Sequence, residues 1–227
     1  MKRAILPALV LFLPSAVLLS RATQHLKARY SGNNSPAFAK SPKIWRWNEL
    51  PGSASDPLAG SRTALIMRGV SELGRPFSGA VMIASAAALL LLWRRRLEAL
   101  FVLATFTGPA ISFLLKAVTH RTRPSPGFED GILSSINRYS FPSGHVVFFE
   151  VFFGFLAYLA YNNLKGAVRW FSVAFSSLLI ILVGPSRVFL GAHWASDVAA
   201  GYVIGAVWLF LLIFAFRKMS NQLSLHQ

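Results

Sequence analysis

Apolar residues along the chain fall into six blocks that short polar segments and two longer loops separate. The blocks cover residues 4–19, 77–93, 97–115, 144–161, 170–190 and 194–216. Each approaches the roughly 20 residues that an α-helix needs to cross the hydrocarbon core of a membrane. The pattern therefore predicts an all-α, polytopic membrane protein built as a bundle of six transmembrane helices.

The first block allows two interpretations. It follows Lys2 and Arg3 and contains Pro7 and Pro14, so it also has features of a signal peptide. No small-residue cleavage site follows it, which favours a retained anchor helix. We expect residues 1–76 to form this anchor and an external loop, and residues 77–227 to form a core of five transmembrane helices.

One stretch of the external loop has a helical pattern of its own. In residues 61–73, apolar side chains stand at positions 64, 65, 67, 70 and 73, and Gly74 follows. This spacing is typical of a short helix that lies on the membrane surface, and a glycine commonly ends such a helix.

The position of the charged residues excludes one class of partner. Only 14% of residues are charged, yet the net charge is +15. The basic residues cluster in the segments that flank the blocks, as at 94–96, 165–169 and 217–218. This arrangement is typical of cytoplasmic linkers in membrane proteins, so we expect a membrane and no nucleic acid as partner. The absence of cysteine excludes disulfides, thiolate zinc sites and a cysteine nucleophile.

If the first span enters from the cytoplasm, the basic linkers at 94–96 and 165–169 lie inside, and three polar clusters face the outer side of the membrane. The first begins with Lys116 at the end of a block and continues to Arg123 and Pro124. An arginine fork and a lysine point charge together suit a phosphate dianion. The alternative is that these basic residues extend to the lipid headgroups, which we expect for His120 and Arg121.

The second cluster is Ser143, Gly144 and His145 at the start of the fourth block. Ser143 can cap a helix, Gly144 lets a ligand approach the backbone, and the helix N-terminus favours an anion. His145 would then be placed to give a proton to a departing oxygen. The alternative is a simple helix cap beside an interfacial histidine.

The third cluster contains Arg187, His193 and Asp197. If residues 193 and 197 share a helix face, Asp197 can accept a hydrogen bond from one ring nitrogen and leave the other free as a nucleophile. Arg187 would balance charge on the phosphoryl oxygens. Glu150 lies seven residues after Ser143, on roughly the same helix face, and is a weaker candidate, because it can equally form an ion pair with a neighbouring helix or lie near the interface.

Together these residues resemble the three-part signature of the type 2 phosphatidic acid phosphatase superfamily: Lys-x6-Arg-Pro, Pro-Ser-Gly-His and Ser-Arg-x5-His-x3-Asp. The resemblance covers about residues 97–216 and implies a phosphatase core. It implies that His193 attacks phosphorus to form a phosphohistidine, that Asp197 orients it and that His145 protonates the leaving group. It further implies a phosphate cradle of Lys116, Arg123, Ser143, Gly144 and Arg187, with no metal and no cofactor.

The expected function is hydrolysis of a phosphorylated lipid at the outer face of a bacterial inner membrane. Undecaprenyl pyrophosphate, phosphatidylglycerol phosphate, phosphatidate and lipid A phosphates all remain candidate substrates, and the residues do not determine the oligomeric state. Two alternatives stay open: a phosphotransferase that uses the same intermediate, and a non-catalytic binder or transporter of phosphorylated lipids. Residues 125–140, between the first two clusters, are expected to cover the pocket.

Overall fold

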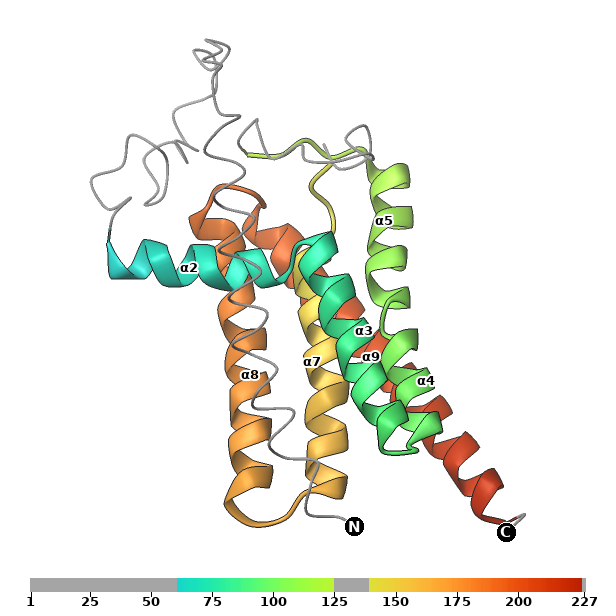
Figure 1. Ribbon diagram of the computed structural model, residues 1–227. Helices are drawn as coiled ribbons and strands as arrows, with labels where there is room; N and C mark the ends of the chain where they lie inside the picture. Colours follow the sequence, from blue (N-terminus) through green and yellow to red (C-terminus); the bar gives the residue numbers. More distant parts are fainter. Residues whose placement is uncertain (1–60, 125–138, 226–227) are drawn as a thin grey trace, which may run out of the picture.

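The computed structural model describes residues 61–124 and 139–225, and all of the elements described there are helices (Figure 1). The predicted first span, residues 4–19, and most of the loop 125–140 lie outside these residues. The helices are α2 (Arg62–Leu73), α3 (Pro76–Leu92), α4 (Arg96–Ala104), α5 (Thr107–Thr119), α7 (Gly144–Asn163), α8 (Gly166–Phe189) and α9 (Ala195–Leu225).

Four helical stretches in the described part of the chain are long and apolar enough to cross a membrane. They are α7, α8, α9 and the continuous pair α4–α5, which spans Arg96–Thr119. Helices α2 and α3 pass the same test only together, and they are bent by 63° at their junction, so the count is at most five. The all-helical, multi-pass architecture is confirmed, but the count of six spans is not.

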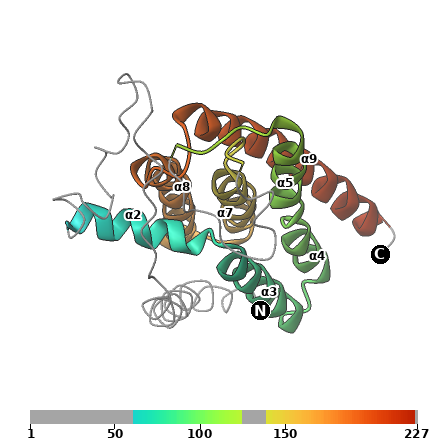
Figure 2. The same cartoon turned by 90° about the horizontal axis from the view of Figure 1, so that it is seen from above.

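Helix α7 lies at the centre of the bundle, with the other spanning helices around it (Figure 2). Its apolar residues lack a single helical stripe because most of them, on all sides of the helix, are buried. A cluster of phenylalanine rings fills the space around it, in which Phe148 and Phe152 stack at 5.4 Å between centroids. This rigid central helix carries the second polar cluster at its first turn.

Helix α2 confirms the predicted short helix at residues 61–73. Ser61 caps its start, where the hydroxyl oxygen accepts a hydrogen bond from the Ala64 backbone N–H at 3.2 Å. Gly74 follows its end. The helix runs across the upper ends of α7 and α8 and packs on α8 (Figure 1). This places its last turn over the polar end of the bundle.

Helix α8 continues through Pro185, which has no N–H to offer the preceding turn. Tyr202 of α9 reaches this point: its hydroxyl donates to the Ile180 carbonyl at 2.7 Å and accepts from the Gly184 N–H at 3.1 Å. In a membrane, backbone polar groups must find partners inside the protein. Tyr202 therefore supports the backbone just before Ser186 and Arg187.

Candidate active site

All three polar clusters lie at the same end of the bundle. Lys116 is in the last turn of α5, Ser143 and His145 begin α7, and Arg187 is in the last turn of α8. His193 lies in the short turn that joins α8 to α9 (Figure 1). The convergence expected from the sequence is therefore present in the fold.

The ring of His193 is buried, and both of its nitrogens have neighbours that define their roles. Nδ1 lies 2.8 Å from the backbone carbonyl oxygen of Ser140. A carbonyl only accepts, so Nδ1 carries the hydrogen. Nε2 lies 3.3 Å from Nη1 of Arg123, which only donates, so Nε2 presents its lone pair. Both contacts specify the same neutral tautomer.

The charge state of His193 agrees with this geometry. Burial, and then the positive charges of Arg187, Arg123 and Lys116, lower the pKa of His193 well below its usual 6.5. The unprotonated ring, which is the nucleophilic form, therefore predominates at neutral pH.

The expected hydrogen bond between His193 and Asp197 is not formed. The closest Asp197 oxygen, Oδ2, is 3.8 Å from Nδ1 and instead accepts from the Trp194 backbone N–H at 2.9 Å. The reason is local: α9 begins at Ala195, so His193 precedes the helix and the two residues are not one turn apart on it. Asp197, in the first turn, reaches back to cap the helix.

Arg121 also differs from expectation. It is not a simple interfacial residue, because Nη1 is 2.6 Å from the fully buried Asp197 carboxylate and 2.8 Å from the Ser196 hydroxyl. Helix α5 stops at His120, which has a left-handed backbone with φ of 48°. The chain then turns back across the bundle and carries Arg121 to α9. The other residue expected at the interface, His120, is exposed.

Ser140, which belongs to none of the three motifs, connects the first two clusters. Thr122 and Tyr139 form an isolated antiparallel bridge, and the Ser140 N–H donates to the Arg121 carbonyl at 2.7 Å. The Ser140 hydroxyl donates to the Thr122 carbonyl at 3.0 Å. This pairing fixes the carbonyl that holds His193. Since that group is backbone, no side-chain pattern could have revealed it.

Arg187 is buried beneath the last turn of α2. Its guanidinium Nη1 donates to the hydroxyl of Ser71, which is also buried. The carbonyl of Arg187 accepts from the N–H groups of Ala192 and His193, at 3.0 and 3.3 Å. The end of α8 is therefore connected to α2 by a side chain and to the His193 turn by its backbone.

Ser143 and His145 hold polar atoms that have no hydrogen-bond partner among the described residues: the Ser143 hydroxyl and Nε2 of His145. Ser143 occupies the cap position of α7, as expected, but its hydroxyl does not bond to the helix. Buried polar groups without partners are rare and costly. Their hydrogen-bonding capacity is available to a ligand at this helix N-terminus.

Lys116 is almost fully buried, with 6% of its surface exposed, close to the buried Arg187. Buried cations are stable only when anions or hydrogen bonds compensate them. The described carboxylates that act on this pair are Asp197, near Lys116, and Glu72, near Arg187, and they are already paired with Arg121 and Arg75. Among the described residues, no three His, Asp or Glu side chains come together as a metal site. The donor set suits an anion.

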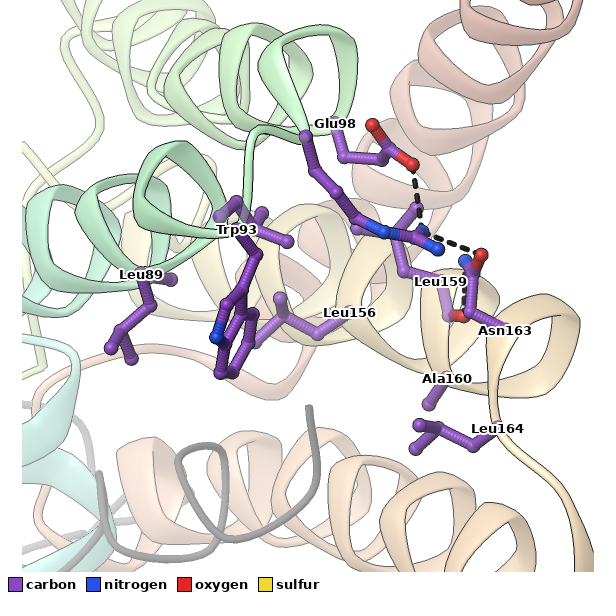
Figure 3. Close-up of a pocket in the computed structure, with 11 residues that line it drawn as sticks. Leu89, Trp93, Glu98, Leu156, Leu159, Ala160, Asn163 and Leu164 are labelled. Atoms are coloured by element: carbon purple, nitrogen blue, oxygen red, sulfur yellow. Dashed lines mark hydrogen bonds and ion pairs between the residues drawn. The ribbon is translucent and has the colours of Figure 1, made fainter. Parts of the chain in front are cut away.

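A pocket of different character lies at the opposite end of the bundle, where α3 joins α4 and α7 ends (Figure 3). Its walls are mainly apolar, and one of the residues that line it, Arg95, bonds with Glu98 at 2.8 Å and Asn163 at 2.6 Å. The pocket is lined by residues of α7 from Leu156 to its end, which lie about 16–28 Å from His145 along the helix axis. It is not part of the phosphate site.

Comparison with known proteins assigns the family. The profile of the PAP2 superfamily matches residues 97–220, more than half of the chain, and the chain belongs to this superfamily. Helices α2 and α3 both precede the matched region. The resemblance noted in the three motifs is thereby confirmed.

Two curated relatives and one solved structure are informative. Phosphatidylglycerophosphatase B of Bacillus subtilis is 27% identical over 150 residues, which cover 65% of this chain and 72% of that protein. Decaprenylphosphoryl-5-phosphoribose phosphatase of Mycobacterium tuberculosis is 30% identical over 142 residues, covering 61% and 72%. The crystal structure of a transmembrane PAP2-type phosphatidylglycerolphosphate phosphatase from Bacillus subtilis matches with a TM-score of 0.59 and 25% identity, over 68% of this chain and 76% of that one.

These relatives are phosphatases, which supports the prediction that the chain is a phosphoric ester hydrolase. The transmembrane neighbour and the apolar helices agree on a multi-pass membrane protein.

Proposed function

We propose that this protein is a membrane-embedded, metal-independent lipid phosphatase that works through a phosphohistidine at His193. The observation that carries the proposal is the pair of contacts on the His193 ring. Nδ1–H is held by the Ser140 carbonyl, and the Nε2 lone pair is directed toward Arg123. A histidine fixed in this tautomer beside buried cations is prepared to attack phosphorus rather than merely to bind an anion.

The cations provide the cradle for the phosphoryl group. Arg123 and Arg187 offer planar forks for its oxygens, and Lys116 adds a point charge. The Ser143 hydroxyl, which has no hydrogen-bond partner in the described part of the chain, and the N-terminus of α7 at Gly144 complete the anion site. Since phosphoryl transfer depends mainly on positioning and electrostatics, these groups would stabilise the charge on the three equatorial oxygens.

The reaction then has two steps. In the first, the Nε2 lone pair of His193 forms a bond to phosphorus, the bond from phosphorus to the lipid oxygen breaks, and His145 gives its proton to that oxygen. In the second, a water oxygen attacks the phosphohistidine, the phosphorus–nitrogen bond breaks, and the water proton passes to His145. Phosphate and the dephosphorylated lipid are the products.

Asp197 has a modified role in this mechanism. The orienting acceptor for His193 is the Ser140 carbonyl, and the Asp197 carboxylate stands 3.8 Å from Nδ1. At this distance a carboxylate still stabilises the imidazolium that forms during attack. Asp197 also holds Arg121 and caps α9, so it would support the nucleophile both electrostatically and through the fold.

The substrate class follows from the membrane setting and from the relatives. The cationic end of the bundle lies where apolar helices end, so the phosphate group of a membrane lipid can reach it while its chain stays in the bilayer. We place this end at the outer face of a bacterial inner membrane, because the basic segments at 94–96 and 165–169 lie at the other end. The names of the relatives support lipid phosphates as substrates.

The test is phosphate release by the detergent-purified protein in excess EDTA, with undecaprenyl pyrophosphate, phosphatidylglycerol phosphate, phosphatidate and lipid A as substrates. Release from one of them would establish the reaction and identify the substrate. If the folded protein transferred the phosphoryl group only to an acceptor other than water, it would be a phosphotransferase. Binding without turnover would instead support the non-catalytic alternative.

A further inference from the structure

Helix α2 precedes the region that the family profile matches, yet it forms one wall of the phosphate site. Ser71 accepts the hydrogen bond from buried Arg187. Three residues further, Gly74 lies directly against His145: a Cβ atom built on Gly74 would be 2.4 Å from Cδ2 of that ring. The last turn of α2 therefore contacts both the phosphate cradle and the group expected to protonate the leaving oxygen.

Arg75 follows Gly74 directly, at the junction of α2 and α3. Its guanidinium pairs with the Glu72 carboxylate at 2.9 Å, and its side chain is 36% exposed. By contrast, Lys116 and Arg187 are 6% and 5% exposed. Arg75 is near enough to His145 and Arg187 to interact electrostatically with both. It is thus a cation at the rim of the site, further out than the groups that would hold the transferred phosphoryl group.

We propose that Arg75 binds a second phosphate group of the substrate, the one that is not transferred to His193. The proposal rests on the proposed lipid phosphatase function. A guanidinium is suited to this task because it can bind two phosphate oxygens at once. Glu72 holds Arg75 in place at the rim and competes with the incoming phosphate. This second phosphate is either adjacent to the first, as in a lipid pyrophosphate, or separated from it, as in phosphatidylglycerol phosphate.

The experiment compares Arg75→Ala with Arg68→Ala, which removes the same charge from an exposed position within α2, seven residues earlier. Three substrates are assayed: a lipid pyrophosphate, phosphatidylglycerol phosphate and phosphatidate, which has a single phosphate. For a substrate whose second phosphate reaches Arg75, we expect Arg75→Ala to raise KM roughly tenfold and to leave kcat nearly unchanged. A tenfold rise is the size expected for the loss of one charge-assisted hydrogen bond that is made equally in the bound substrate and in the transition state. KM for phosphatidate should change by less than about twofold.

A second variant tests the opposite direction. Glu72→Gln removes the competing carboxylate and should lower KM for the same two-phosphate substrate, whereas Arg75→Lys should recover part of the affinity. The response of the two-phosphate substrates separates adjacent from distant second phosphates. The proposal would be overturned if Arg75→Ala and Arg68→Ala had equal KM values for both two-phosphate substrates. It would also be overturned if Arg75→Ala raised KM for phosphatidate as much as for the two-phosphate substrates.

A binding assay separates this proposal from the proposed function. In the His193→Ala background, which needs no turnover, calorimetry measures inorganic pyrophosphate against inorganic phosphate. We expect a preference for pyrophosphate that Arg75→Ala reduces about tenfold and Arg68→Ala leaves intact. The absence of any preference would overturn the rim site even if the enzyme is active. A clear preference in a protein that hydrolyses none of the lipids would refute only the proposed hydrolysis.

Discussion

The contact between Gly74 and His145 gives a sharp test of the proposed leaving-group acid. In Gly74→Ala, the new Cβ would lie 2.4 Å from Cδ2 and 3.0 Å from Cγ of His145, and 3.0 Å from Cε2 of Phe149. Carbon atoms in ordinary contact are about 3.5–4.0 Å apart, so the imidazole must move by roughly 1 Å. Phe149, the other neighbour of the new Cβ, is fully buried, so its ring has little space to move aside.

A displacement of this size is costly for a catalytic group. A misplacement of about 1 Å can reduce a rate by about 10²-fold, and a general acid typically contributes about 10²–10⁴. We therefore expect kcat for a lipid phosphate to fall about 100-fold in Gly74→Ala. For p-nitrophenyl phosphate, whose leaving group departs with little need for a proton, the loss should be much smaller.

The matched control is Gly69→Ala on the same helix. A Cβ at Gly69 has no neighbour within 4 Å, and alanine favours helix by about 1 kcal/mol over glycine. This variant should keep full activity and be slightly more stable. Equal kcat values for the two variants, with both folded, would refute the reasoning. So would equal losses for the lipid and for p-nitrophenyl phosphate.

Further predictions concern the metal, pH and two supporting residues. Phosphate release should be unchanged in excess EDTA; loss that Mg²⁺ restores would require a metal-dependent mechanism. Burial lowers the pKa of His193, so below pH 6.5 the unfolded chain binds a proton at this residue that the native chain does not. The thermal midpoint of unfolding should therefore fall as the pH drops below 6.5, and it should fall less in His193→Gln. Arg121→Ala leaves the buried Asp197 without its cation and should lower activity. Because Arg121 itself is 40% exposed, the loss of stability should be about 1–3 kcal/mol, and no change would show that the pair is dispensable. Tyr202→Phe removes the hydroxyl that serves the α8 backbone and should cost about 1–3 kcal/mol in unfolding experiments.

The helices and the three motifs could be predicted from the sequence because their signals are local. Apolar blocks of membrane-spanning length gave the spans from 97 onward, and residues 61–73 gave the short helix that ends at Gly74. The motif residues were recognisable because Lys116, His145 and His193 are polar or charged side chains at the ends of such blocks, where burial needs a chemical reason.

Other features depend on long-range geometry that no local pattern encodes. The acceptor for His193 is a backbone carbonyl, so the identity of Ser140 carries no signal. Arg121 reaches Asp197 only because α5 ends in a left-handed residue and the chain then turns back. The contact of Ser71 with Arg187 joins residues 116 positions apart, across a segment whose own pattern indicated only a membrane surface. The helix α9 begins only at Ala195, so His193 lies before it and does not share a helix face with Asp197.

The central claim is that His193 carries the phosphoryl group, and trapping this intermediate tests it most directly. The protein is mixed with a substrate lipid labelled with ³²P in the transferred phosphate, quenched within milliseconds in alkaline detergent, and digested with protease. The account predicts acid-labile, base-stable label on the peptide that contains His193, and neither label nor turnover in folded His193→Ala. Label on another residue, or near-normal phosphate release by His193→Ala, would contradict it.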